Sequence, residues 1–336
     1  MLLFYVQKAA SVLRTAGPIF FLRAVKYKIL SQLGFSQLMS LFLCPSHECN
    51  ANCVHCYEKF AFKKSDRLTT REVKDVLDQF RRLGGLVVHL CSGEFLLRKD
   101  RIEIIRYIND NHMYPSVTSN GLLLDEGMID TLKSAGLKEL VVSIDSADPA
   151  RHDELRGVPG CFDKATNALR IAGDKGINTA IWTYVTKTNF LELDGVSTLG
   201  KELGVQYTWV FFPLLSGHLF DRFDENLTFE EREAFRKEFN SRPETLLEFP
   251  KETDICVGGG KNHICVMPSG DVTFCPPVPY SYGNIRTRTL KDCLRDIVSD
   301  HKKFCVSKCT GQCIVNFPEY RENCNARFMY DEQRSA

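Results

Sequence analysis

The sequence predicts an α/β protein built on a barrel or partial barrel of parallel strands, followed by a small cysteine-rich domain. Apolar, β-branched runs alternate with helical patterns through the middle of the chain, and each crossover is long enough for the helix that parallel strands require. Of the 14 cysteines, only Cys91 and Cys161 fall between Cys56 and Cys256. With 44% hydrophobic and 25% charged residues, the composition is that of an ordinary globular protein.

Length, charge and the first residues limit the class of protein further. A chain of 336 residues has the length of about two domains. Its 43 basic residues nearly cancel its 42 acidic ones, which argues against overall attraction to nucleic acid. The opening MLLFYVQK lacks the features of a signal peptide, and no run of ~18 apolar residues follows. We therefore expect a reducing, cytoplasmic setting, where clustered cysteines bind metal or iron–sulfur more often than they form disulfides.

The front segment, residues 1–37, has the pattern of a basic amphipathic helix. Residues 1–47 contain five basic residues and no acidic one. Pro18 suits a helix start and Gly34 a stop, and the apolar residues between them at helical spacing are Leu22, Val25, Ile29 and Leu33. Such a helix either packs on the barrel or a second copy, which is our preferred interpretation, or lies on an anionic membrane surface.

Six segments then have the character of buried strands. The first is 40–44, and the helical pattern after it begins at Thr69, a suitable N-cap, and ends before Gly84 and Gly85. The other five strands are expected at 86–91, 114–119, 139–144, 178–185 and 205–212. Because strand order cannot be deduced from these patterns, a doubly wound open sheet is the alternative to a barrel.

Polar and glycine-rich residues follow several of these strands directly. They are Ser92-Gly93-Glu94, Ser119-Asn120-Gly121, Asp145 and residues 186–189. Loops of this kind need turn residues in any case. Their recurrence after successive strands nevertheless favours a functional site at the carboxyl ends of the sheet.

The segment CNANCVHCY places Cys49, Cys53 and Cys56 in a C-x3-C-x2-C pattern. Thiolates bind iron–sulfur clusters, and a 4Fe–4S cluster commonly takes four of them. Three cysteines therefore leave one iron free for another ligand. A zinc site usually shows paired C-x2-C units and four protein ligands, which Cys44 or His47 could complete.

This motif, placed after the first strand and followed by Tyr57, resembles that of the radical S-adenosylmethionine (SAM) enzymes. The resemblance extends over roughly residues 38–325. It implies a partial (β/α)6 barrel in which SAM binds the open iron through its amino and carboxylate groups. One electron from the cluster then cleaves SAM to methionine and a 5′-deoxyadenosyl radical, which abstracts hydrogen from a substrate. It also implies an electron donor such as flavodoxin or ferredoxin.

The residues after the second strand match a further motif of that family. Ser92, Gly93 and Glu94 correspond to a Gly-Gly-Glu stretch, in which the glutamate accepts a hydrogen bond from the amino group of SAM. The family has proline at the next position, where this sequence has Phe95. The geometry of this loop could therefore differ from that of the family.

Later strand ends supply the remaining cofactor-binding candidates. Asn120 in TSNG and both Ser143 and Asp145 in VSID match positions that face SAM, the last two near its ribose or carboxylate. Arg156 in RHDELRG matches an arginine that reaches the SAM carboxylate, for which a forked guanidinium is suited. No catalytic residue beyond this cofactor site is assigned.

The tail resembles the extension called SPASM, or its shorter relative the twitch domain, both of which hold auxiliary iron–sulfur clusters. Cys256 precedes a glycine-rich step, and Gly270-x4-Cys275 follows. Pro250 and the spacing Cys305-x3-Cys309 depart from the full pattern. We expect at least one auxiliary cluster bound by Cys256 and Cys275, with further ligands from Cys305, Cys309, Cys313 and Cys324. Cys265 and Cys293 are interpreted as packed thiols, and a structural zinc is the alternative.

The predicted domains are an amphipathic segment at 1–37, a radical SAM barrel at 38–215, a helical linker at 216–249, an auxiliary-cluster domain at 250–325 and a tail at 326–336. The apolar, basic front suggests a lipid or isoprenoid substrate and peripheral membrane contact. A peptide or small metabolite is the alternative substrate, although the front is too short for the peptide-recognition domain found in many related enzymes. The outcome after hydrogen abstraction stays open among bond formation, dehydrogenation and epimerisation.

A second class is a non-enzymatic iron–sulfur or zinc protein, such as an electron carrier. Glu94, Asn120 and Arg156 argue against it, because a carrier needs no SAM pocket.

Overall fold

The computed structural model describes residues 2–33, 38–56, 58, 66–211, 263–276, 278–304 and 318–329, with a few positions between 227 and 247. Several predicted positions lie outside these described residues, as does most of the predicted linker. They are Gly34, Tyr57, Pro250, Cys256, Cys305, Cys309 and Cys313.

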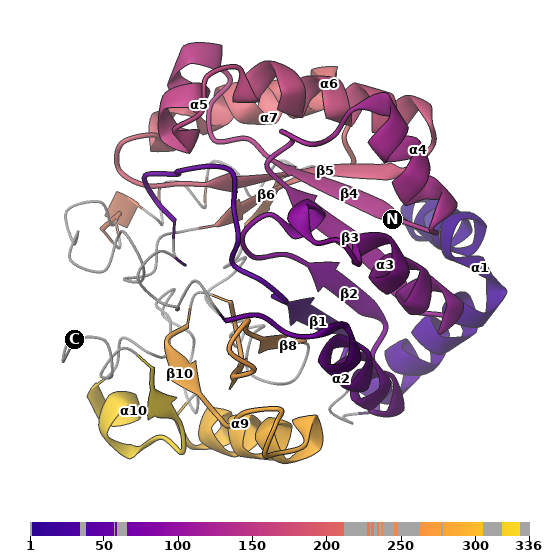
Figure 1. Ribbon diagram of the computed structural model, residues 1–336, viewed down its shortest axis with the longest axis vertical. Coiled ribbons are helices and arrows are strands. Elements are labelled where there is room, and N and C mark those ends of the chain that lie inside the picture. Colours follow the sequence, from indigo (N-terminus) through magenta and orange to yellow (C-terminus); the bar gives the residue numbers. More distant parts are fainter. Residues whose placement is uncertain are drawn as a thin grey trace.

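One curled sheet organises the molecule (Figure 1). Its order is β7-β6-β5-β4-β3-β2-β1-β8-β9, in which β1 to β8 are parallel and β9 is antiparallel. Strands β1 to β6 lie side by side in chain order. In a doubly wound sheet, the order of the strands would reverse at a point inside the sheet. The barrel prediction is therefore confirmed and the doubly wound alternative is wrong. The predicted strands are β1 (Ser40–Leu43), β2 (Val87–Leu90), β3 (Tyr114–Ser119), β4 (Glu139–Ser143), β5 (Asn178–Tyr184) and β6 (Tyr207–Phe211).

Two parallel strands that the sequence did not reveal extend this set at its two edges. They are β7 (Thr245–Leu247) beside β6 and β8 (His263–Val266) beside β1. Strand β8 belongs to the tail predicted to begin at about residue 250, so the tail contributes directly to the barrel sheet.

Helices cover the outer face of the sheet (Figure 1). The first, α2, begins as predicted after Thr69, whose hydroxyl accepts the Glu72 N–H while the Glu72 carboxylate accepts the Thr69 N–H. Apolar side chains of alternate strand positions meet these helices in one continuous core. The helices are α2 (Thr70–Arg82), α3 (Arg101–Asp110), α4 (Glu126–Ser134), α5 (Pro149–Arg156), α6 (Cys161–Asp174) and α7 (Leu193–Glu202), with short 3₁₀ turns at Phe95–Leu97 and Phe190–Glu192.

The inner face of the sheet is rich in aromatic rings. The ring of Trp182 on β5 lies 6.2 Å from that of Phe42 on β1 and 6.4 Å from that of His89 on β2, measured between centroids. These strands are not neighbours in the sheet, so the contacts cross its concave side. The sheet is therefore curled enough for its inner side chains to meet.

Helix α1 (Leu2–Gln32) lies at the amino-terminal edge of the strands and is kinked at Gly17, where φ is 84°. The guanidinium of Arg23 donates to the carbonyls of Gly85 and His112, and Phe20 packs on Tyr114. The helix therefore packs on the barrel, as the preferred interpretation expected. Within the described part of the chain, no helix is both long and apolar enough to cross a bilayer.

The tail adds a small unit next to α2. Its α9 (Leu290–Phe304) contacts α2, where the Gln79 side chain accepts the Leu290 N–H at 2.9 Å. An ion pair between Arg286 and Glu72, 2.6 Å long, joins the same two regions. The other elements of the tail are β9 (Val272–Thr273), β10 (Tyr280–Ser281), α10 (Pro318–Asn323) and β11 (Arg327–Phe328), which pairs with β10.

Candidate cofactor site

The cysteine loop leaves the carboxyl end of β1 and is fastened to two later segments. The carbonyl of Glu48 accepts the Glu94 N–H at 2.7 Å. The N–H of Asn52 donates to the Arg156 carbonyl, and that of Val54 to the Leu155 carbonyl, both at 3.0 Å. The carboxyl end of α5 thus holds the middle of the loop through its backbone.

The three predicted cysteines of this loop form no disulfide and differ in their surroundings. Cys49 is exposed, while Cys53 and Cys56 are half-buried. The sulfur of Cys49 accepts the Ala51 N–H at 3.4 Å and lies 3.9 Å from the Asn120 amide nitrogen. N–H donors to sulfur are a common feature around iron–sulfur clusters, so the loop has suitable chemistry for one.

The thiols do not surround a single point. Within the described residues, no three histidine, cysteine or carboxylate side chains are close enough to hold one metal ion. A cluster makes a different demand, because its thiolates bind separate irons.

Glu94 is fixed beside this loop with its carboxylate buried. One oxygen accepts the Ser119 hydroxyl at 3.1 Å and the Asn120 N–H at 2.8 Å, and the other accepts the Leu96 N–H at 3.2 Å. Burial penalises the charged form and raises the pKa of Glu94 to about 7, although these three donors oppose the rise. The structure thus brings Glu94 and Asn120 together, as the motifs suggested.

The loop before Glu94 has an unusual backbone. Ser92 adopts φ of 81°, and a Cβ on Gly93 would strike the Glu48 carbonyl. Phe95, the departure from the family motif, is buried in the core and begins the short 3₁₀ turn that Glu94 caps. The substitution is therefore accommodated by packing.

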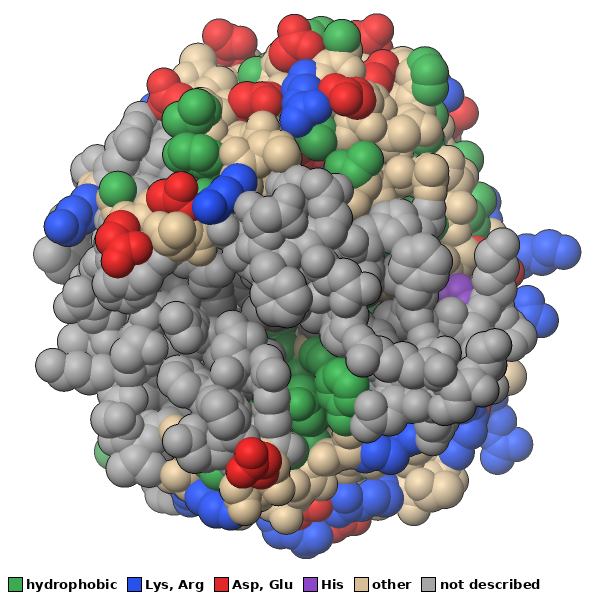
Figure 2. Space-filling model, turned by 90° about the vertical axis from the view of Figure 1, so that its left-hand side faces the viewer, with side chains coloured by type: hydrophobic (Ala, Val, Ile, Leu, Met, Phe, Trp, Pro, Cys, Tyr) green, Lys and Arg blue, Asp and Glu red, His purple; other side chains and the backbone are tan. Residues whose placement is uncertain are grey.

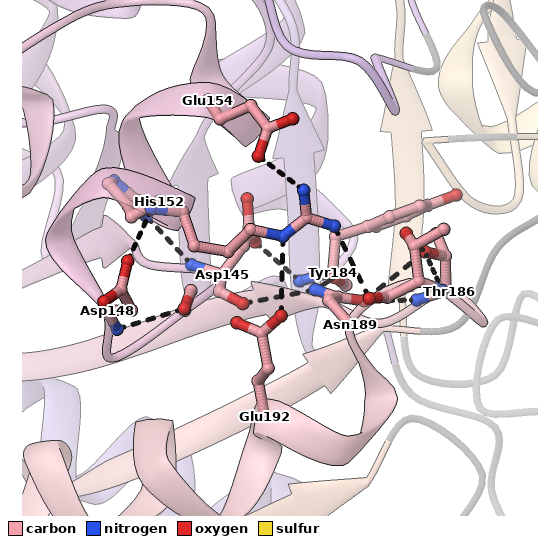
Figure 3. A network of polar contacts seen from close by, with 11 residues as sticks. Asp145, Asp148, His152, Glu154, Tyr184, Thr186, Asn189 and Glu192 are labelled. Atoms are coloured by element: carbon pink, nitrogen blue, oxygen red, sulfur yellow. Dashed lines mark hydrogen bonds and ion pairs between the residues drawn. The ribbon is translucent and has the colours of Figure 1, made fainter.

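Asp145 lies in a network of polar contacts at the carboxyl end of β4 (Figure 3), and its side chain is fully buried. Its carboxylate accepts the Tyr184 N–H at 2.9 Å and lies 2.7 Å from the Arg156 guanidinium and 3.4 Å from the His55 ring. Burial alone would raise the pKa of Asp145, but Arg156, His55 and His152 hold it below its usual range. Ser143, in contrast, is half-buried two residues earlier.

Two side chains of this region were missed by the sequence analysis. His55 stacks on Tyr184, with ring centroids 4.9 Å apart, and Glu58 accepts the Gly93 N–H at 2.8 Å. The only signal for them was their position inside or just after the cysteine motif.

The described tail cysteines occupy separate environments. Cys275 follows β9 and Cys324 follows α10, and both are half-buried at the edge of the core. Cys293 is buried in α9 and Cys265 on β8. This burial agrees with their interpretation as packed thiols.

Among the described residues, Cys44 contacts two other buried cysteines and not the cysteine loop, where it was considered as a zinc ligand. Its sulfur is buried at 3.7 Å from that of Cys91 and 3.8 Å from that of Cys265, on the inner face of the sheet. This trio was not predictable from the sequence, because its members lie in or directly after three strands that are distant in the chain.

Figure 2 views the side opposite α1 and shows a group of hydrophobic side chains near the middle of that face. Several inner-face aromatic residues are half-buried, among them Trp182 and Trp209.

Comparison with known proteins supports this geometry. Residues 43–194 match the radical SAM superfamily. The AdoMet-dependent heme synthase of Methanosarcina barkeri is 35% identical over 170 residues, 50% of this chain and 49% of the relative. The antilisterial bacteriocin subtilosin biosynthesis protein AlbA of Bacillus subtilis is 25% identical over 260 residues, 71% of this chain and 56% of the relative. The chain thus spans about half the length of these curated relatives.

Among solved structures, that of Streptococcus suis SuiB bound to the precursor peptide SuiA is similar in fold. Its TM-score is 0.67 at 18% identity, over 92% of this chain and 79% of SuiB. Together with the curled parallel sheet and the cysteine loop after β1, the matches confirm the family predicted from the sequence. They also confirm, at the level of the family, the cofactor pair of a 4Fe–4S cluster and SAM. Residues 43–194, somewhat less than half of the chain, thus match the radical SAM superfamily, in agreement with the resemblance predicted from the sequence.

Proposed function

We propose that the protein is an enzyme that cleaves SAM reductively and abstracts hydrogen from a substrate held in the curled sheet. The observation that carries this proposal is the cysteine loop, fastened beside Glu94 and Asn120 at the carboxyl ends of β1 to β3. Bound there, the cluster and SAM would supply one-electron cleavage to a 5′-deoxyadenosyl radical. Cys49, Cys53 and Cys56 would hold the cluster, and a flavodoxin or ferredoxin would supply the electron.

The other site residues then have roles in orienting SAM. Glu94 would accept the amino group through the oxygen that accepts only the Leu96 N–H. Asn120 would line the cofactor from the end of β3 and Ser143 from β4. Ser92 donates to the Ser46 carbonyl and Gly93 lies against the Glu48 carbonyl, so both keep the two loops close together.

The test is anaerobic reconstitution with iron and sulfide, followed by dithionite, SAM and chromatography for 5′-deoxyadenosine. We expect its formation with an equal amount of methionine. A protein that takes up iron and binds SAM but forms no 5′-deoxyadenosine would contradict the proposal.

For the substrate we propose a peptide. Support comes from the relatives: AlbA is named for biosynthesis of a bacteriocin, and SuiB was crystallised with a precursor peptide. No relative reported above is named for a lipid, so the peptide alternative replaces the lipid hypothesis. The similarity to the heme synthase makes an iron porphyrin the competing substrate. Faster 5′-deoxyadenosine formation with a peptide fraction of the source organism, lost after protease treatment, would support a peptide. Acceleration by an iron porphyrin instead would contradict it.

We further propose at least one auxiliary iron–sulfur cluster in the tail. Cys275 and Cys324 are half-buried at the edge of the core, unlike the fully buried Cys265 and Cys293, which favours them as ligands of a cluster. The proposed additional ligands are Cys256, Cys305, Cys309 and Cys313. A structural zinc is the alternative, and metal analysis separates the two.

The affinity for SAM is expected to rise between pH 6 and pH 8. The carboxyl of Glu94, with its pKa raised to about 7, loses its proton over this range and becomes the better acceptor. Calorimetric titration of the cluster-loaded protein at each pH measures this. The control is Glu94→Gln. In this variant the groups of SAM still change their protonation with pH, but the side chain of residue 94 does not. Parallel pH profiles for the two proteins would show that Glu94 does not bind SAM.

We also propose that α1 contacts an anionic lipid surface. Its inner side is occupied by the barrel, but Leu22, Ile29 and Leu33 on the other side are 66%, 51% and 67% exposed. Lys26 and Lys28 are exposed on the same helix, and residues 1–47 contain no acidic side chain. An apolar surface with positive charge fits anionic lipid better than neutral lipid or a basic partner.

The protein should therefore sediment together with anionic liposomes at low salt. Reversing Lys26 and Lys28 to glutamate should weaken binding strongly, since each basic residue near such a surface contributes about 1 kcal/mol. Arg23 is left unchanged because it holds the helix to the barrel. The matched control reverses Lys133 and Lys164, which lie on other helices. Equal loss in both variants, or no binding by the unaltered protein, would contradict the proposal.

A further inference from the structure

Arg156 occupies a position that its family motif does not explain. Its Nη2 lies 2.7 Å from the Asp145 carboxylate and its Nη1 is 3.7 Å from the Cys53 sulfur. The side chain of Arg156 is only 10% exposed, and that of Asp145 is not exposed at all. The outer nitrogens of the fork are therefore both engaged by the protein itself.

The third nitrogen offers no easier route to a SAM carboxylate. Nε of Arg156 is buried and has no hydrogen-bond partner among the described residues. A bidentate grip on a carboxylate needs two accessible N–H groups on one edge of the guanidinium. This arrangement turns the guanidinium toward the cysteine loop.

The backbone reinforces the same contact. The carbonyls of Leu155 and Arg156 accept the N–H groups of Val54 and Asn52, on either side of Cys53. Gly157 ends α5 with φ of 66°, and a Cβ there would lie 2.7 Å from the Asn52 carbonyl. The carboxyl end of α5 and the middle of the cysteine loop are thus built to touch.

We propose that Arg156 is a positioning residue for the cluster at Cys49, Cys53 and Cys56, with its charge on the Cys53 thiolate and Asp145 as its anchor. The inference deepens the proposed function, on which it rests. Reduction adds negative charge to a cluster, so a fixed positive charge and an N–H donor at one thiolate favour the reduced state. Arg156 would make the cluster easier to reduce, and another group would meet the SAM carboxylate.

The test compares Arg156→Gln with the unaltered protein after reconstitution. The front cluster is identified by electron paramagnetic resonance as the reduced signal that changes when SAM is added. Its midpoint potential, measured by redox titration without SAM, should move to a more negative value in Arg156→Gln. The dissociation constant for SAM should change less than twofold.

Two further variants keep the test decisive. Arg156→Lys retains a positive charge that can pair with Asp145, so it should fold if Arg156→Gln does not, and should show the smaller negative shift. Arg151→Gln removes a charge from the same helix, where Arg151 pairs with Glu154 and Glu192, and should leave the potential unchanged.

An unchanged midpoint potential in both Arg156 variants overturns the inference. So does a tenfold or larger loss of SAM affinity in Arg156→Gln, which would place the residue on SAM. If the unaltered protein itself assembles no SAM-responsive cluster, the proposed function fails first. If the unaltered protein cleaves SAM but the midpoint potential of its cluster does not depend on Arg156, this inference is wrong and the proposed function stands.

Discussion

Replacing Cys49, Cys53 and Cys56 together by alanine is expected to reduce 5′-deoxyadenosine formation below detection. These thiols are the proposed ligands of the cluster that delivers the electron, and three substitutions leave no thiolate in the loop. Iron analysis of the same variant tests the tail. Roughly four iron atoms per chain should remain if the tail binds one 4Fe–4S cluster, and roughly eight if it binds two.

The matched control is Cys293→Ala, which removes a buried thiol of α9 away from the cysteine loop. It should retain SAM cleavage and its full iron content, apart from a moderate loss of stability. SAM cleavage by the triple variant would contradict the assignment of the front cluster. Iron near zero with equimolar zinc in that variant would show that the tail holds zinc.

The parallel sheet was predictable because its central strands are apolar runs with helix-length crossovers between them. Segments such as 86–91 and 139–144 are buried on both faces and have few other interpretations. Strands β7 and β8, which flank the six predicted strands, carry no such signal. The first has three residues, and the second joins the sheet by pairing with β1, which precedes it by more than 200 residues.

The cofactor site was predictable where chemistry is local in sequence. Glu94 and Asn120 directly follow their strands, so parallel topology brings them together. The engagement of Arg156 by Cys53 and Asp145 was not predictable. It depends on how far α5 reaches over the cysteine loop, which is a matter of packing between segments about 100 residues apart.

Substituting Asp145 by asparagine is expected to lower the free energy of unfolding by about 3–5 kcal/mol, because it leaves the buried charge of Arg156 without its partner. Asparagine keeps the size of the side chain and can still accept the Tyr184 N–H, so little space is lost. Its amide would, however, turn an N–H donor toward the Arg156 and His55 donors. Urea denaturation of the protein without cofactors, followed by circular dichroism, measures the difference.

The pH dependence and a second substitution identify the cause of this loss. The pKa of Asp145 is lowered in the folded state, so the carboxylate stabilises the fold above its unfolded pKa of about 3.9. The gap between the two proteins should therefore narrow as the pH falls below about 4. Adding Arg156→Leu to Asp145→Asn should recover part of the stability, since no unpaired charge remains. Glu154→Gln, which breaks the more exposed pair with Arg151, should cost no more than about 1 kcal/mol. A similar cost for Asp145→Asn would mean that the buried pair contributes no more to folding than this exposed one.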